Sequence, residues 1–319
     1  LSSIDLPPDK SIPLGMDNND ASSSCQTDSR IEVAPGVALH VSLRQGGKRV
    51  PVVFAHGFGQ THHGWKATAN ALAAAGHPSL IFDARGHGDS AHNAADLPYQ
   101  PEQFVDDLIA LSGQFDTPPV LVGASMGGLF GLIAESRWPG LFSAMVLVDI
   151  TPRWEPAGVE RILAFMGAHP EGFASFDAAA DAIARYQPQR ARKSEQALRA
   201  ILRAGDDGRL RWHWDRRLLT ELGRDAAQHQ QHIARAAASV QIPLLLVSGG
   251  RSDMVSHATI SEFQQLVPHA QHAHLPQATH MVAGDDNDAF TTTVMQYLDA
   301  LPAQATDGSS LNTHPTGAP

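Results

Sequence analysis

The sequence predicts an α/β fold in which helices flank a mostly parallel, doubly wound β-sheet. Short, continuous apolar runs suit strands that are buried on both faces. Helix-like segments separate these runs, and such alternation is typical of a parallel sheet. The longest interruption, residues 152–240, is rich in Ala, Arg and Gln, carries helical patterns and contains no convincing strand. We therefore expect a helical insertion there.

The expected elements follow one another along the chain. Residues 37–44 alternate apolar and polar side chains, as a half-buried strand does. The other strands are expected at residues 50–55, 79–84, 120–124, 144–150 and 242–250, with a weaker one at 271–275. Helices are expected at residues 65–76, at 101–115 with Pro101 at the start, and at 285–301.

Composition sets the expected domain boundaries. Residues 1–30 and 303–319 are polar and lack apolar periodicity, so we expect a flexible N-terminal arm and a flexible C-terminal tail. Residues 31–151 and 241–302 form the expected core, and residues 152–240 form the expected cap, or lid. This cap would cover the carboxyl edge of the sheet, where open α/β sheets bind ligands.

Charge and hydropathy exclude several kinds of partner. The chain of 319 residues carries a net charge of −10, which does not suit a nucleic-acid partner. No apolar run reaches the roughly 18 residues that a membrane span requires. The one cysteine, Cys25, excludes an internal disulfide. We expect a soluble monomer or homodimer and favour the cytoplasm over secretion. The chain begins at Leu1, and whether a signal or transit segment precedes it stays open.

One stretch, VLVGASMGGLFG at residues 120–131, places a serine between glycines where a strand becomes a helix. Gly-x-Ser-x-Gly in that context is a nucleophile elbow. The turn forces strained backbone dihedrals on the serine. Side chains on the neighbouring residues would clash, so glycines are needed at positions 123 and 127. The turn also sets the hydroxyl at a helix N-terminus, where backbone N–H groups can meet a developing oxyanion. We therefore predict Ser125 as a nucleophile.

Several ordered motifs extend this interpretation. They are FAHGFG (54–59), FDARGHGDS (82–90), GASMGG (123–128), SGGRSDMVS (248–256) and ATHMVAGD (278–285). In this order, over roughly residues 31–301, they resemble the α/β-hydrolase superfamily. The resemblance implies a Ser–acid–His triad and a helical cap between the sixth and seventh strands of the sheet. It also implies that FDARGHGDS is a structural loop, tied together by an Arg and an Asp.

The resemblance assigns roles to three further residues. His-Gly-x-Gly at residues 56–59 matches the oxyanion loop, which implies the backbone N–H groups of Phe58 and Met126 as oxyanion donors. His280 follows the last strand, where the superfamily places its general base.

The acid that orients His280 has two candidates. Asp253 follows the strand at residues 242–250, the commoner position in the superfamily. Asp149 ends the preceding strand, and it could instead brace the start of the cap. We prefer Asp253 and keep Asp149 as the alternative.

Side chains near these groups predict an apolar substrate pocket. The candidates are Trp154, Trp212, Trp214 and Met281, together with His56. We expect His56 mainly to brace the oxyanion loop. His62 and His63 are adjacent, which does not suit a shared metal ion.

These assignments favour a serine hydrolase that cleaves a carboxylic ester or lactone, a small molecule, without a metal or organic cofactor. A carbon–carbon bond hydrolase of a vinylogous diketone uses the same triad and is the first alternative. A cofactor-free perhydrolase or haloperoxidase is the second. A non-enzymatic ligand receptor is disfavoured, because such proteins usually lose a member of the triad.

Overall fold

A computed structural model describes residues 26–222, 226–285 and 287–302. An eight-stranded sheet forms the centre, with the strand order β1-β2-β4-β3-β5-β6-β9-β10. Its strands are β1 (Gln26–Ala34), β2 (Val37–Arg44), β3 (Val52–Ala55), β4 (Ser79–Phe82), β5 (Val120–Ala124), β6 (Ala144–Val148), β9 (Leu244–Gly249) and β10 (Gln271–Leu275). The β1–β2 and β2–β4 pairs are antiparallel, and the other neighbours are parallel. The predicted fold class is confirmed.

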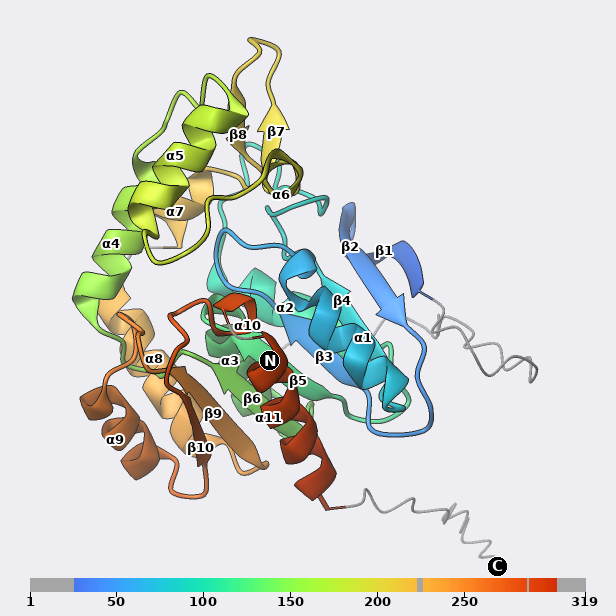
Figure 1. The fold of residues 1–319 in the computed structure, drawn as a ribbon. Coiled ribbons are helices and arrows are strands. Elements are labelled where there is room, and N and C mark those ends of the chain that lie inside the picture. The colour runs from blue at the N-terminus through green and yellow to red at the C-terminus, as the bar shows by residue number, and fades with distance from the viewer. Residues whose placement is uncertain (1–25, 223–225, 286, 303–319) are drawn as a thin grey trace, which may run out of the picture.

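Helices cover both faces of this sheet (Figure 1). One layer holds α1 (Lys66–Ala74) and α11 (Asn287–Ala300), and the other holds α2 (Pro101–Ser112), α3 (Met126–Arg137), α8 (Ala226–Ser239) and α9 (His257–Leu266). Short helices η1 (His62–Trp65) and α10 (Val282–Asp285) precede α1 and α11. Successive β3 side chains enter opposite layers, Val53 one and Phe54 the other. Burial on both faces explains the continuous apolar runs.

The cap lies between β6 and β9, which are the sixth and seventh strands of the sheet (Figure 1). It contains α4 (Pro156–Gly167), α5 (Phe176–Tyr186), α6 (Glu195–Arg199) and α7 (Arg217–Glu221). It also contains a hairpin of β7 (Leu202–Ala204) and β8 (Leu210–Trp212). The prediction that this segment lacks strands is therefore wrong. Strands of three residues are too short to show a two-residue periodicity.

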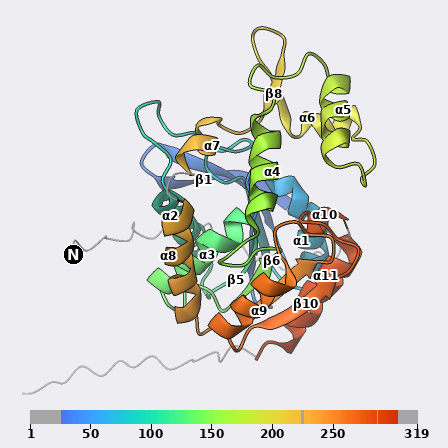
Figure 2. The ribbon, with the colours of Figure 1, turned by 90° about the vertical axis from the view of Figure 1, so that its left-hand side faces the viewer.

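Two predicted boundaries also change. Strand β1 begins at Gln26, inside the segment expected to be a flexible arm, and pairs with β2 over its length. It is an edge strand with Ile31 as its one buried residue, so it shows no apolar pattern. Helix α8 packs against α3 in the core rather than belonging to the cap (Figure 2). Residues 1–25 and 303–319 lie outside the described residues, so the predictions for them stay untested.

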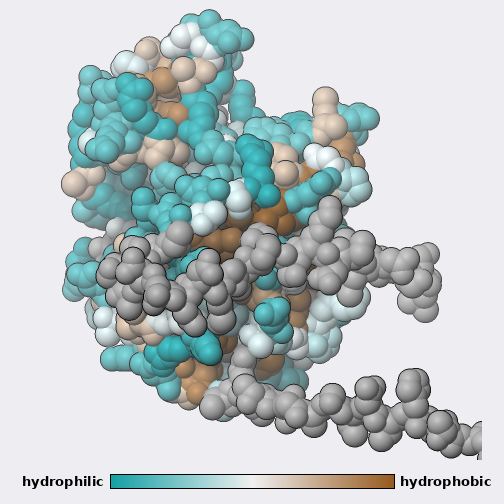
Figure 3. All heavy atoms as spheres, turned by 90° about the vertical axis from the view of Figure 1, so that its right-hand side faces the viewer, coloured by the Kyte–Doolittle hydropathy of each residue, from teal (hydrophilic) through white to brown (hydrophobic). Residues whose placement is uncertain are grey.

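Polar side chains dominate the face seen in Figure 3, where apolar residues gather near the middle.

Among the described residues, no helix has both the length and the apolar character needed to cross a bilayer.

Candidate active site

Ser125 occupies a strained turn between β5 and α3. Its backbone has φ 46° and ψ −116°, a conformation that non-glycine residues rarely adopt. The Ser125 N–H donates to the carbonyl oxygen of Val148 at 3.2 Å, and the Leu129 N–H donates to the Ser125 carbonyl at 3.0 Å. Strain of this kind persists only where the surrounding structure holds it. The predicted strand–turn–helix geometry is therefore present.

Glycines beside Ser125 allow the close backbone approach in this turn. A Cβ atom on Gly123 would lie 2.7 Å from the Cα of Gly128, and one on Gly127 would lie 2.5 Å from the carbonyl oxygen of Ala55. Both contacts are with backbone atoms, which cannot move aside as a flexible side chain can. The structure thus agrees with the requirement for Gly123 and Gly127.

His280 lies after β10, in the turn that leads to α10. Its Nδ1 lies 2.8 Å from Oδ2 of Asp149, which is fully buried at the end of β6. The other Asp149 oxygen accepts the Gly249 N–H at 2.8 Å, and Oδ2 also accepts the Ser252 hydroxyl. Because an ionised carboxylate only accepts hydrogen bonds, this contact places the imidazole proton on Nδ1. The Nε2 atom is then left free to accept a proton.

Asp253, the preferred candidate for the acid, has a different partner. Its Oδ2 accepts a hydrogen bond from Arg161 Nη1 on α4 at 2.8 Å. In the loop after β9, Ser252 faces Asp149 while the next residue, Asp253, faces the cap. The choice of Asp253 as the partner of His280 is therefore wrong in this structure, and Asp149, the alternative, takes that position. Asp149 braces β9 through Gly249, and among the described residues its carboxylate forms no hydrogen bond with the start of the cap.

The oxyanion loop follows β3. The Gly57 N–H donates to Gln60 Oε1 at 3.3 Å, and the Gly59 N–H donates to His87 Nε2 at 3.1 Å. Within the described residues, the Phe58 N–H between them donates to no protein atom. Met126 is the first residue of α3, so its N–H has no acceptor within the helix. The two amides fit the predicted role of oxyanion donors, which stays a prediction.

His56 braces this loop from below. Its Nδ1 donates to the Gly57 carbonyl at 2.8 Å, and its Nε2 accepts the Ala84 N–H at 2.9 Å. Burial lowers the pKa of His56 and favours the neutral ring that these bonds require. Both ring nitrogens are used and the residue is buried, so its place among the pocket residues is corrected.

His213, directly after β8, joins the cap to the oxyanion loop. Its Nδ1 accepts the Gly88 N–H at 2.8 Å, and its Nε2 lies 3.2 Å from the Gly59 carbonyl oxygen. Burial lowers the pKa of His213 to about 4. Its position between two tryptophans was visible in the sequence, but its contact with Gly59 depends on how the cap folds back.

Two cavities meet at Ser125. One, of about 870 Å³, also contains His280 and is lined by Trp212 and Met281. The other, of about 830 Å³, is lined by Trp154. Trp214 lines neither, because it is buried against the Phe58 ring with the ring centroids 5.1 Å apart. Trp214 is thus corrected from pocket to packing residue, and substrate contact by the other three stays a prediction.

The predicted structural loop, residues 82–90, is tied by buried charges. Asp83 Oδ1 accepts both the backbone N–H and the Nδ1–H of His62 at 2.8 Å, and its Oδ2 accepts the Asp89 N–H at 3.0 Å. Burial acts to raise the pKa of Asp83, but the hydrogen bond and charge of His62 hold it well below its usual value. Arg85 binds Asp107 through two nitrogens, at 2.6 and 2.9 Å.

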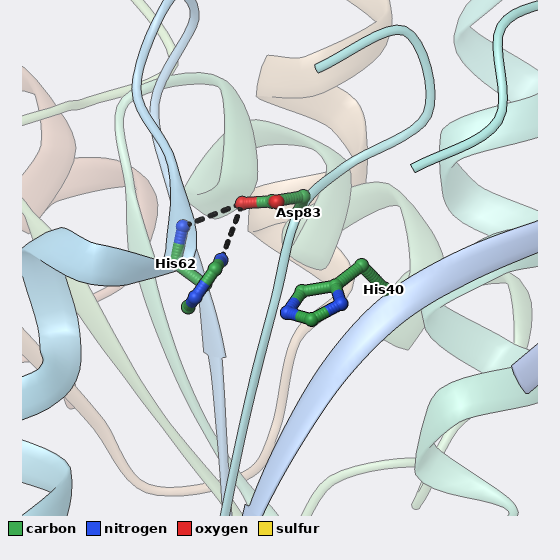
Figure 4. Close-up of side chains that lie close together, drawn as sticks. All are labelled: His40, His62 and Asp83. Carbon is green, nitrogen blue, oxygen red and sulfur yellow. Dashed lines mark hydrogen bonds and ion pairs between the residues drawn. The ribbon is translucent and has the colours of Figure 1, made fainter. Parts of the chain in front are cut away.

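Asp83 of this loop also belongs to the one group of described residues with metal-ligand chemistry in close range, together with His40 of β2 and His62 of η1. The ligating atoms of His40, His62 and Asp83 lie within 4.8 Å of one another (Figure 4). Three N–H donors already satisfy the Asp83 carboxylate without an ion. The cluster therefore suits a loop brace better than a metal site.

Comparison with known proteins identifies the class. The family described as alpha/beta hydrolase fold matches residues 50–286. The chain therefore belongs to this family and is a hydrolase.

Individual relatives cover most of the chain. The esterase Rv0045c of Mycobacterium tuberculosis is 30% identical over 267 residues, which are 81% of this chain and 86% of the relative. Its crystal structure superposes with a TM-score of 0.69, at 27% identity over 87% of this chain and 93% of the other. The mouse sn-1-specific diacylglycerol lipase ABHD11 is 29% identical over 299 residues, covering 86% and 89% of the two chains. An α/β hydrolase from Novosphingobium aromaticivorans superposes with a TM-score of 0.73, at 26% identity over 87% and 99%.

Proposed function

We propose that this protein is a serine hydrolase that cleaves a carboxylic ester or lactone through an acyl-enzyme on Ser125. One observation carries the proposal: Ser125, held in a strained turn, lines the same cavity as His280, and buried Asp149 binds His280 Nδ1. Two relatives named as an esterase and a lipase support an ester as the bond that is cleaved.

Acylation begins when Ser125 Oγ attacks the substrate carbonyl carbon. His280 Nε2 takes the hydroxyl proton, and Asp149 stabilises the imidazolium that forms. The N–H groups of Phe58 and Met126 bind the oxygen that becomes negative in the tetrahedral intermediate. The imidazolium then protonates the leaving alcohol, and the acyl group stays on Ser125.

Deacylation repeats these steps with water as the nucleophile. His280 takes a proton from water, which attacks the acyl carbon, and the acid product leaves as Ser125 regains its proton. Among the described residues, no hydrogen bond joins Ser125 Oγ to the imidazole. Such bonds are often long without substrate and tighten when substrate binds.

The proposal is tested with p-nitrophenyl esters from acetate to dodecanoate, using wild type beside Ser125→Ala. Wild type is expected to release p-nitrophenol, with a preferred chain length, and Ser125→Ala is expected to lose at least about 10³-fold in kcat. Equal activity of the two proteins would exclude Ser125 as the nucleophile. If the wild type is inert on every ester but cleaves a vinylogous diketone, the proposed reaction is wrong and the protein is a carbon–carbon bond hydrolase.

A further inference from the structure

The two cavities that meet at Ser125 have opposite chemistry. The cavity that contains His280, which we call the basic cavity, is lined by four cationic side chains and one carboxylate among the described residues. They are Arg161, Arg190, Lys193, Arg251 and Asp253. This excess of positive charge stands out on a chain whose net charge is −10. A pocket of this sign, close to the reacting atoms, attracts anions.

The second cavity, which we call the apolar cavity, is lined mainly by hydrocarbon side chains. They include Leu129, Phe130, Ile133, Trp154, Val159 and Leu163. Its charged lining residues in the described part of the chain are Glu102, Arg137 and Arg235, of which Arg137 is paired with Asp106 at 2.9 Å. This cavity suits an uncharged chain.

Helix α4 separates the two cavities as it runs from the cap toward the core (Figure 2). Arg161 and Phe165, four residues apart, line the basic cavity, whereas Val159 and Leu163, also four apart, line the apolar cavity. Residues four apart lie on one face of a helix, so opposite faces of α4 line the two spaces. A substrate at Ser125 therefore extends one substituent to each side of α4.

The position of His280 decides which substituent lies on which side. The general acid must deliver its proton to the oxygen of the leaving alcohol, so the alcohol must lie beside His280. His280 lines the basic cavity and not the apolar one. The alcohol part of an ester thus enters the basic cavity, and its acyl chain enters the apolar cavity.

Within the basic cavity, three of the four cations already contact other groups of the protein. Arg190 Nη1 donates to Gln187 Oε1 at 3.4 Å. Arg161 binds Asp253 and the Tyr186 carbonyl, both at 2.8 Å, and Arg251 binds the side chain of Gln277. Lys193 is half-buried and forms no ion pair with any carboxylate in the described part of the chain. Burial, together with the charge of Arg190, lowers the pKa of Lys193. A ligand anion would supply the missing countercharge.

We infer that the substrates are esters of an apolar acid with an alcohol that carries an anionic group, a carboxylate or a phosphate, which binds to Lys193. This inference rests on the proposed ester hydrolysis at Ser125. It assigns the specificity for the alcohol to the cap and the specificity for the acyl chain to the wall shared by α3 and α4.

The test compares three aryl octanoates that differ only in the alcohol. They are 4-octanoyloxybenzoate, its neutral methyl ester and 4-octanoyloxyphenyl phosphate. We expect wild type to give kcat/KM at least tenfold higher for an anionic probe than for the neutral one, and the better of the two anions identifies the group. Lys193→Gln should lower this anionic-to-neutral ratio at least fivefold.

A matched control is Arg192→Gln. Arg192 is the neighbour of Lys193, but it is exposed and paired with Asp177 and Asp181 outside the cavity, so its loss should leave the ratio unchanged. A ratio near one in wild type, or one that Lys193→Gln does not change, would overturn the inference while ester hydrolysis itself stands. If no probe is cleaved, including the neutral one, the proposed function fails instead.

Discussion

His280 and Asp149 are joined by a hydrogen bond of 2.8 Å between Nδ1 and Oδ2, although 131 positions separate them in the chain. The carboxylate has no exposed surface and also binds the Gly249 N–H and the Ser252 hydroxyl. These contacts fix its orientation before substrate arrives. The carboxylate that binds His280 therefore follows the sixth strand of the sheet, and the loop after the seventh strand supports it.

Asp149→Asn should inactivate the enzyme, because an amide in that place can hold the imidazole in the wrong tautomer. Replacements of this kind lower kcat by about 10⁴-fold where the histidine acts as the base. The measurement is kcat on p-nitrophenyl butyrate. The comparison variant is Asp253→Asn, which removes the negative charge beside Arg161 and should cost less than about tenfold. The reverse pattern would restore Asp253 as the acid.

The fold and the strained turn that holds Ser125 could be predicted, because local sequence patterns indicate both. Continuous apolar runs mark strands with two buried faces, and Gly123 and Gly127 mark a crowded turn. Which of two carboxylates reaches His280 could not be predicted, because both follow sheet strands. The outcome depends on the direction of each side chain in the loop after β9. There Ser252 points toward Asp149, the partner of His280, whereas Asp253 points toward Arg161 of the cap.

Contacts made by the cap were also beyond prediction. His213 reaches Gly59 across 154 positions, and no local pattern indicates such a pairing. The polar edge strand β1 and the hairpin of β7 and β8 were missed because polarity or shortness hides their periodicity.

Gly127→Ala should destabilise the protein, because the new Cβ would lie 2.5 Å from the backbone oxygen of Ala55. Overpacking of this kind costs about 1–3 kcal/mol, and the displaced turn should also lower the activity of Ser125. The free energy of unfolding in urea measures the first effect. Gly167→Ala is the control, since a Cβ at Gly167 meets no atom within 4 Å and should change stability by less than about 1 kcal/mol. Equal stability of the two variants would contradict the crowding seen at the turn.

Stability should fall as the pH is lowered from about 6.5 to 4, because His213 is buried in its neutral form. Its pKa is about 4 in the folded protein, below its usual value near 6.5, so the unfolded chain binds more protons in this window. The contribution of neutral His213 to the free energy of unfolding is complete above pH 6.5. It is lost as the pH falls, and the loss reaches about 3 kcal/mol at pH 4. Urea unfolding at pH 7.0, 5.5 and 4.0 measures the slope.

The variant His213→Asn keeps an acceptor for the Gly88 N–H but cannot take up a proton in this range. Its slope between pH 6.5 and 4 should therefore be shallower than that of wild type. Other histidines whose pKa values burial also lowers, among them His56 and His87, should contribute to the remaining slope. Parallel curves for wild type and variant would show that His213 does not contribute.

Asp83→Asn should loosen the loop that supports the oxyanion turn. The carboxylate accepts two N–H groups of His62 and one of Asp89, and a neutral amide offers one acceptor oxygen and two surplus donors. Leaving buried donors unsatisfied costs about 1–3 kcal/mol, so the melting temperature should drop by several degrees. Asp106→Asn is the control, because Asp106 forms an exposed ion pair with Arg137, and pairs of that kind contribute at most about 1 kcal/mol. A drop that is no larger for Asp83→Asn than for Asp106→Asn would mean that the buried contacts of Asp83 do not hold the loop.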